Sequence, residues 1–136
     1  MKKLVFLIAF IPCFLGAQSV YRFNNYTIND GLSQSSVNTV IQDGNSALWI
    51  GTQDGLNRFD GVKFEIFNSD ENKGIDNPFI TSSTKAQDGS LCFGTRNGLT
   101  VYNLDKESFQ TYSPEGNQNL DISSVCAGKG QDLWVS

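Results

Sequence analysis

Four aspartates are the side chains of this sequence best suited to chemistry: Asp43, Asp54, Asp60 and Asp88. Carboxylates could act in acid–base catalysis or bind calcium. These four are spread along the chain, however, and form no compact run of oxygen ligands like that of a calcium-binding loop. Each stands in a turn-like sequence, where an aspartate bonds its own main chain. We therefore expect turn residues, with no catalytic residue, no metal site and no cofactor, and the ligand-binding residues stay unknown.

Histidine is absent from all 136 residues. This removes the commonest general base near neutral pH, the commonest metal ligand, and any Ser–His or Cys–His nucleophile pair. We therefore do not expect this segment to be an enzyme.

The charge balance argues against nucleic-acid binding by this segment. The formal net charge is −4 and the pI is near 4.6. No basic stripe is present to neutralise phosphates, and an anionic membrane surface is disfavoured for the same reason.

The chain starts like an exported protein. Lys2 and Lys3 precede an apolar run at residues 4–15, and the small residues Gly16 and Ala17 follow. This pattern is typical of a secretory signal peptide, here residues 1–17. The run is shorter than the roughly 20 apolar residues of a membrane span. We predict cleavage after Ala17 and export of the mature chain.

The three cysteines leave two questions open. Cys13 could be a lipid-attachment site, but residues 10–12 lack the small side chains typical of such sites. Cys92 and Cys126 could pair in an oxidising compartment. We favour two small buried hydrophobic side chains instead, because both positions align with apolar or small residues in the repeat described next.

A repeat is the strongest feature of the sequence. Residues 48–60 recur without a gap 43 residues later, at 91–103, and a third copy begins at residue 133. The shared residues are Leu48, Trp49, Gly51, Thr52, Gly55, Leu56 and Phe59, then Leu91, Gly94, Thr95, Gly98, Leu99 and Tyr102, then Leu133 and Trp134. A period of about 40 to 45 residues is that of a four-stranded propeller blade.

Each repeat divides into four β-rich runs separated by turn residues, in the first copy at 37–42, 47–52, 56–60 and 63–68. Tight hairpins are expected at Asp54–Gly55 and Asp60–Gly61 because glycine adopts positive φ without steric cost. We therefore predict an all-β fold, a β-propeller of four-stranded antiparallel blades. Blades stack face to face, so Trp49 and Trp134 should fill the space between them.

Gly51 and Gly94 stand inside predicted strands of this repeat. Glycine there marks a bulge or a close approach of neighbouring backbone. Exposed aromatics such as Tyr26, Phe67 and Tyr112 could stack on sugar rings. We favour packing between blades, because aromatic residues suit half-buried strand positions.

The repeat divides the mature chain into parts. We assign residues 18–30 to an N-terminal outer strand that closes the ring, 31–70 to a first blade, 71–115 to a second and 116–136 to the start of a third. Two blades and a stub cannot bury the faces that further blades would cover. We therefore expect a truncated N-terminal fragment that is only marginally stable alone.

The run at residues 43–60 resembles the two-component regulator propeller repeat, whose pattern places an aspartate and a small residue before Leu-Trp-Ile-Gly-Thr, then Gly-Leu, a basic residue, an aromatic residue and an aspartate. The lead-in at residues 31–37 resembles the start of such sensors. Cys92 and Ser136 depart from the pattern, which has tryptophan and glycine at those positions. The resemblance covers essentially all of the mature chain.

That resemblance implies the periplasmic sensor region of a hybrid two-component system of Bacteroidetes. It implies further propeller blades, a membrane helix and usually a histidine kinase downstream, with an oligosaccharide or other small ligand as partner and a homodimer at full length. A secreted propeller enzyme of the lyase or quinoprotein type, or a scaffold that binds partner proteins without signalling, remain alternatives.

Overall fold

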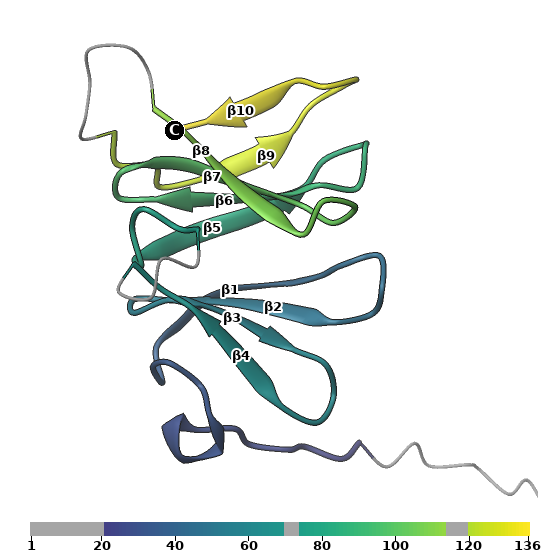
Figure 1. Ribbon diagram of the computed structural model, residues 1–136, viewed down its shortest axis with the longest axis vertical. Coiled ribbons are helices and arrows are strands. Elements are labelled where there is room, and N and C mark those ends of the chain that lie inside the picture. The colour runs from purple at the N-terminus through teal and green to yellow at the C-terminus, as the bar shows by residue number, and fades with distance from the viewer. Residues whose placement is uncertain (1–20, 70–73, 114–119) are drawn as a thin grey trace, which may run out of the picture.

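The computed structural model describes residues 21–69, 74–113 and 120–136. Three antiparallel sheets stack one upon the next in chain order (Figure 1). The first sheet is β1 (Val37–Gln42), β2 (Leu48–Thr52), β3 (Leu56–Phe59) and β4 (Phe64–Phe67), the second is β5 (Ile80–Lys85), β6 (Leu91–Thr95), β7 (Gly98–Asn103) and β8 (Ser108–Tyr112), and the third is β9 (Val125–Ala127) and β10 (Leu133–Val135). The predicted all-β class is confirmed.

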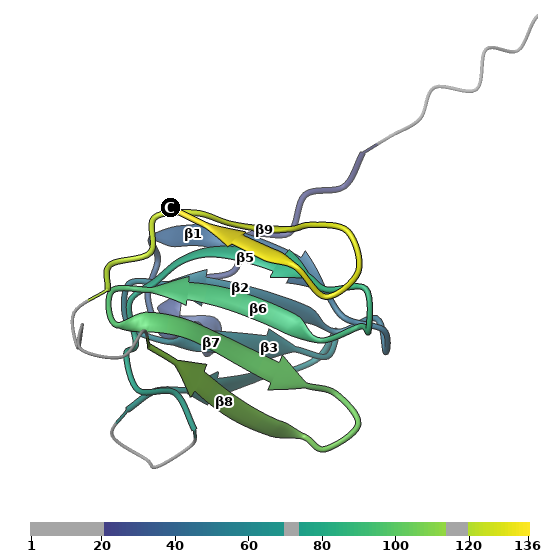
Figure 2. The same cartoon turned by 90° about the horizontal axis from the view of Figure 1, so that it is seen from above.

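Within each sheet the strands follow one another in sequence order, each antiparallel to the last. The four strands expected in the first repeat match β1 to β4 to within one residue at either end. The first strands β1, β5 and β9 lie along one side of the stack, and β8 lies on the opposite side (Figure 2). Sheets that share an inner edge in this way are the arrangement of propeller blades.

The β3–β4 hairpin forms as its sequence predicts. The Asp60 carboxylate accepts hydrogen bonds from the N–H groups of Val62, at 2.8 Å, and Lys63, at 2.9 Å. Gly61 has φ of +97°, which the turn requires and glycine adopts without strain.

The β2–β3 turn lies one residue earlier than expected. Residues 53 and 54 form its centre, and Gly55 closes it with φ of +135°. The Thr52 N–H and hydroxyl groups both donate to the Gly55 carbonyl, at 3.0 and 2.9 Å. The threonine side chain therefore shares in the turn, and glycine is needed where the chain leaves it rather than at its centre.

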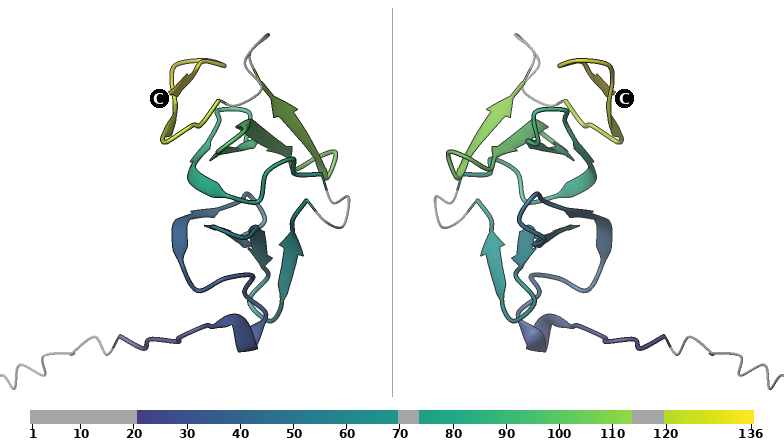
Figure 3. Two further views of the ribbon diagram at one scale, coloured as in Figure 1. Left: turned by 90° about the vertical axis from the view of Figure 1, so that its left-hand side faces the viewer. Right: turned by 90° about the vertical axis from the view of Figure 1, so that its right-hand side faces the viewer.

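The ring-closing strand expected at residues 18–30 stays a prediction, because its partner would be a last blade that the described residues do not include. Residues 21–27 belong to no strand, and a 3-10 helix, η1 (Ile28–Asp30), follows them. Tyr26 packs on the rings of Phe59 and Phe64, with centroids 5.0 and 5.6 Å apart. The segment thus meets the side-chain face of β3 and β4 and not a sheet edge, on the far side of the first sheet from the second (Figure 3). A strand needs a neighbouring strand to bond.

Residues 1–20, with the predicted signal peptide and Cys13, lie outside the described residues, and their assignments stay predictions. In the described part of the chain, no helix is long and apolar enough to cross a membrane.

Candidate functional site

Trp49 occupies the centre of the interface between the first two sheets. Its side chain is fully buried. Its ring stacks on Phe67 of the same sheet at 5.5 Å and meets Tyr102, Phe93 and Phe109 of the next sheet at 4.5, 6.1 and 6.1 Å between centroids. Aromatic clusters of this kind stabilise an interface beyond the area they bury. Trp49 therefore fills the space between sheets, as its position in the repeat predicts.

Asp43 fixes the orientation of that tryptophan. Its Oδ2 accepts the indole N–H at 2.9 Å, and its Oδ1 accepts two N–H groups of its own turn. The sequence predicted that Asp43 bonds its own turn, but it did not predict the hydrogen bond between Asp43 and Trp49. A signal was present, because the second repeat replaces both members of the pair together, by Ala86 and Cys92.

The other three aspartates also lie at turns. Asp60 bonds its own turn as described, and the Asp88 carboxylate accepts the Ser90 N–H at 2.9 Å. Asp54 is exposed at the centre of the β2–β3 turn, where its N–H donates to the Thr52 hydroxyl at 3.1 Å. Over the described ranges, no group of three or more His, Cys, Asp or Glu is placed to hold a metal ion.

Gly51 and Gly94 mark close approaches between sheets. A Cβ atom at Gly51 would lie 2.5 Å from Cγ2 of Ile80, and one at Gly94 would lie 2.8 Å from Cγ2 of Ile122. The sequence predicted a close approach of neighbouring backbone at these glycines. In the structure the neighbour in the next sheet is a side chain instead. The accompanying bulge is found in the paired strands β1 and β5, not in the strands that hold the glycines.

Hydrogen bonds between successive sheets recur at equivalent positions. The Gly55 N–H donates to the Pro78 carbonyl at 2.9 Å, and the Gly98 N–H donates to the Leu120 carbonyl at 2.8 Å. The relation between the first and second sheets is therefore repeated between the second and third.

Side chains of the inner strands make a second set of such bonds. The Asn38 amide donates to the Ile80 carbonyl at 2.7 Å, and the Thr81 hydroxyl donates to the Ile122 carbonyl. Asn38 and Thr81 are 43 residues apart and occupy the second position of β1 and β5. Each thus contributes one hydrogen bond to the next repeat.

The repeat also extends into the segment before each inner strand, which sequence reasoning missed. Gly31 and Gly74, 43 residues apart, have φ of +106° and +90°. Each lies against an aromatic ring of its own sheet, Phe64 and Phe109 respectively. Leu32 and Ile75 follow them and are both buried. The matching Gly-Leu and Gly-Ile pairs could have been found from their spacing.

Polar groups tie this lead-in to the first sheet. The Ser33 N–H donates to Asn57 Oδ1 at 2.8 Å, and its hydroxyl bonds the Thr52 hydroxyl at 2.8 Å. Asn57 and Thr52 are fully buried. Buried polar groups need such partners, so the lead-in completes the fold of the first sheet.

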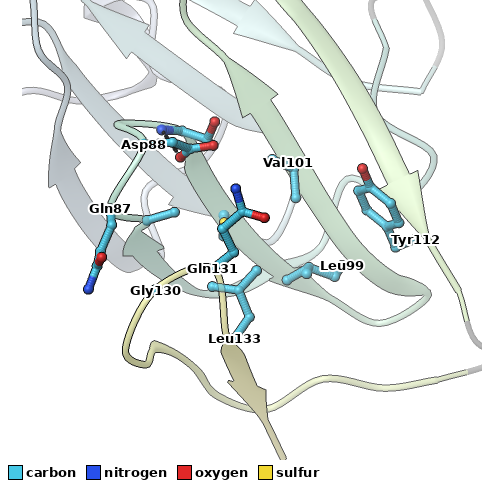
Figure 4. Close-up of a pocket in the computed structure, with 11 residues that line it drawn as sticks. Gln87, Asp88, Leu99, Val101, Tyr112, Gly130, Gln131 and Leu133 are labelled. Carbon is cyan, nitrogen blue, oxygen red and sulfur yellow. Dashed lines mark hydrogen bonds between the residues drawn. The ribbon is translucent and has the colours of Figure 1, made fainter.

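A cleft of about 460 Å³ lies between the second sheet and the third (Figure 4). Its walls include Cys92, Leu99, Val101 and Tyr112 from the second sheet and Leu133 from β10. Cys92 stands where the first sheet has Trp49. The cleft therefore occupies, between the second and third sheets, the place that the Trp49 side chain fills between the first and second.

Trp134 has its predicted position in the repeat, on β10, but it is not buried. It was predicted to fill space between blades, but its side chain is 70% exposed. It lies on β10, in the last sheet of this chain, and points away from the second sheet, whereas Leu133 lines the cleft. A tryptophan at this position of the repeat packs on the following sheet, as Trp49 does.

The two thiols of the described residues are free and differ in environment. Cys92 is buried, and loss of hydration raises its pKa to about 11, with a smaller contribution from the charge of Asp88. Cys126 is exposed. The prediction of two buried thiols is therefore right for Cys92 and wrong for Cys126.

Two further groups have shifted pKa values. Burial raises the pKa of Tyr102, and the charge of Glu107 adds to this effect. Hydrogen bonds from the backbone N–H groups of Lys63 and Val62 lower the pKa of Asp60. Both shifts follow from packing and turn geometry.

A polar pocket of about 370 Å³ is lined by residues of three successive repeats. Asn38, Thr81 and Ser123, at the same position of three successive repeats, form part of its wall. Phe79, Arg96 and Asp121 complete it. This pocket brings together groups that could recognise a polar ligand.

Comparison with known proteins places this geometry among bacterial sensors. The chain matches a solved structure described as the extracellular domain of a hybrid two-component system, BT3049 of B. thetaiotaomicron, with 29% identity and a TM-score of 0.71 over 82% of this chain and 17% of that one. It resembles the extracellular region of a two-component system. The likeness extends to sequence, since 64 residues, 46% of this chain, are 50% identical to histidine kinase P4 of Formosa agariphila.

The chain spans 5% of that kinase's length. No protein-family model matches the chain.

Proposed function

We propose that this chain is the N-terminal part of a periplasmic, ligand-sensing β-propeller in a two-component signalling protein, a hybrid histidine kinase that responds to oligosaccharides. Further sheets complete the ring, and a membrane helix and kinase follow. The protein acts as a homodimer. This segment contributes ligand recognition and part of the ring, and the phosphoryl chemistry is carried out elsewhere.

The observation that carries this proposal is the repeated sheet-to-sheet geometry together with the match to an extracellular domain of a hybrid two-component system. Equivalent hydrogen bonds join the first sheet to the second and the second to the third. A constant step of this kind suits a ring of stacked blades, in which each sheet contacts only its neighbours. A ring held together in this way offers a rigid surface for a ligand.

A ligand controls a receptor only through different affinities for its signalling states. The test is therefore made on the full-length protein in membranes. Autophosphorylation is measured with a panel of oligosaccharides, in the native protein and in Trp49→Ala, which loses the aromatic contacts between the first two sheets. We expect one sugar class to change the rate in the native protein and to have a smaller effect in the variant.

The gene itself provides a control. A membrane helix and a histidine kinase downstream of codon 136 favour the sensor. A stop codon directly after the ring favours the enzyme or the scaffold and overturns the proposal, as does a kinase rate that no oligosaccharide changes.

A further inference from the structure

Where two repeats have the same backbone geometry but different side chains, the fold does not require the side chain that differs. The β2–β3 and β6–β7 turns have the same construction, with a threonine hydroxyl donating to the carbonyl of the closing glycine at 2.9 Å in both. The residue after that threonine is Gln53 in the first turn and Arg96 in the second. The turn therefore accepts either side chain, and the positive charge of Arg96 serves no need of the turn.

Arg96 is nonetheless held in place. Its guanidinium carbon lies 3.8 Å from the centre of the Phe79 ring. This cation–π contact also departs from the repeat, because the position of Phe79 is serine in the first repeat and aspartate in the third. Two residues that are both particular to the second repeat thus meet in space, at the polar pocket.

The Arg96 side chain is exposed. Within residues 21–69, 74–113 and 120–136, Arg96 makes no ion pair, whereas Arg58 pairs with Glu65 at 3.8 Å. The pocket's Thr81 hydroxyl donates to the Ile122 carbonyl, and the Asn38 amide donates one of its two hydrogens to the Ile80 carbonyl. Arg96 is therefore the charged donor that the pocket offers a ligand, beside the second Asn38 amide hydrogen, and its planar fork suits a carboxylate or sulfate.

From this arrangement we infer that the pocket lined by Phe79, Arg96 and Asp121 binds a sugar unit that carries an anionic oxygen group, a carboxylate or a sulfate ester. Arg96 holds the anionic group, and its stacking on Phe79 orients it in advance. The exposed Asp121 carboxylate accepts hydrogen bonds from sugar hydroxyls. The inference rests on the proposed sensing function and specifies the class of oligosaccharide.

The test uses the full-length protein and isothermal titration calorimetry with three probes of equal length: galacturonate oligomers, sulfated galactose oligomers and neutral galactose oligomers. Arg96→Gln is the informative variant, because glutamine already occupies the equivalent turn position at Gln53 and should leave the fold intact. Arg58→Gln is the matched control, since it removes the same charge from the outer part of the first sheet.

We expect at least one anionic probe to bind the native protein and Arg58→Gln equally. Arg96→Gln should weaken that binding by about ten- to a hundredfold, the range for a charge-assisted hydrogen-bonded pair. Raised salt should weaken anionic binding to the native protein more than to Arg96→Gln. Binding of the galacturonate oligomer indicates a carboxylate ligand, and binding of the sulfated galactose oligomer indicates a sulfate ester.

Equal binding of anionic probes to the native protein and Arg96→Gln overturns the inference, and so does binding of neutral oligomers alone. The outcome is separable from that of the proposed function. A neutral sugar that changes kinase activity leaves the sensor intact and removes this inference. If an anionic sugar needs Arg96 for binding but does not change kinase activity, the binding inference stands and the proposed sensing function falls.

Discussion

Replacing Gly51 by alanine tests the close approach between the first two sheets. The added methyl carbon would lie 2.5 Å from Ile80 Cγ2 and 2.7 Å from Thr39 Cγ2. Carbon atoms prefer about 3.5–4.0 Å, so the inner strand of the second sheet must move. Overpacking of this kind costs about 1–3 kcal/mol, or roughly 5- to 150-fold in the folding equilibrium. Urea denaturation measures the loss, and amide exchange at Gly55, whose N–H bridges to Pro78, reports local opening.

A second substitution gives the mechanism a sharper test. Ile80→Ala removes Cγ2, the atom nearest to the new methyl, and alone it should cost about 2–5 kcal/mol because Ile80 is fully buried. In the double variant the shortest contact, with Ile80 Cγ2, is removed, while those with Thr39 Cγ2 at 2.7 Å and the Cβ of residue 80 at 2.9 Å remain. The combined loss should therefore fall short of the sum by about 0.5 kcal/mol or more. Gly44→Ala is the control, since its Cβ would lie 3.8 Å from the nearest atom. Additive losses, or a neutral Gly51→Ala, would refute the packing argument.

Three further predictions concern the same interface and the free thiols. Trp49→Ala should destabilise the chain by about 3–5 kcal/mol, while Trp134→Ala should change the stability of this chain by less than about 0.5 kcal/mol; similar losses in urea denaturation would contradict the burial argument. Asp43→Ala leaves the buried indole N–H without an acceptor, at about 1–3 kcal/mol, and should alter tryptophan fluorescence; an unchanged spectrum and stability would argue against the contact. At pH 8 a thiol reagent should modify Cys126 in the folded protein and Cys92 only after unfolding, and mass spectrometry of the labelled peptides would show the reverse order if Cys92 were accessible.

The positions of the strands could be predicted because the repeat supplies several independent observations of one pattern. Turn residues at equal spacing separate β-rich runs in both complete copies, and an error in one copy would conflict with the other. The sequence also indicated that Trp49 packs between sheets. It did not reveal the partner of its indole N–H, because the turn geometry that brings the Asp43 carboxylate to that N–H depends on the fold of the whole β1–β2 hairpin.

Burial was harder to predict than strand position. Trp49 and Trp134 are equivalent in the repeat, yet one is fully buried and the other is 70% exposed. Strand pairing is local to each repeat, but burial depends on which sheet lies over the residue. Period and composition therefore predict which face a side chain points to, and the neighbouring sheet decides whether that face meets protein or water. The N-terminal segment shows the same limit, because a strand-like sequence forms no strand without an edge to bond.

The two outer faces of the stack support the proposal of further sheets. Ile80 and Ile122 are 0% and 1% exposed because each lies against the strand glycine of the preceding sheet, whereas the equivalent Val37 is 45% exposed. At the other end Trp134 is exposed on the face that Trp49 uses to meet the next sheet. One end thus presents the side chain that a preceding sheet would receive, and the other presents the ring that a following sheet would cover. The two outer faces thus match in the way that successive sheets of this chain do. A closed ring of repeats requires this match, since each unit must bind a copy of itself on both sides.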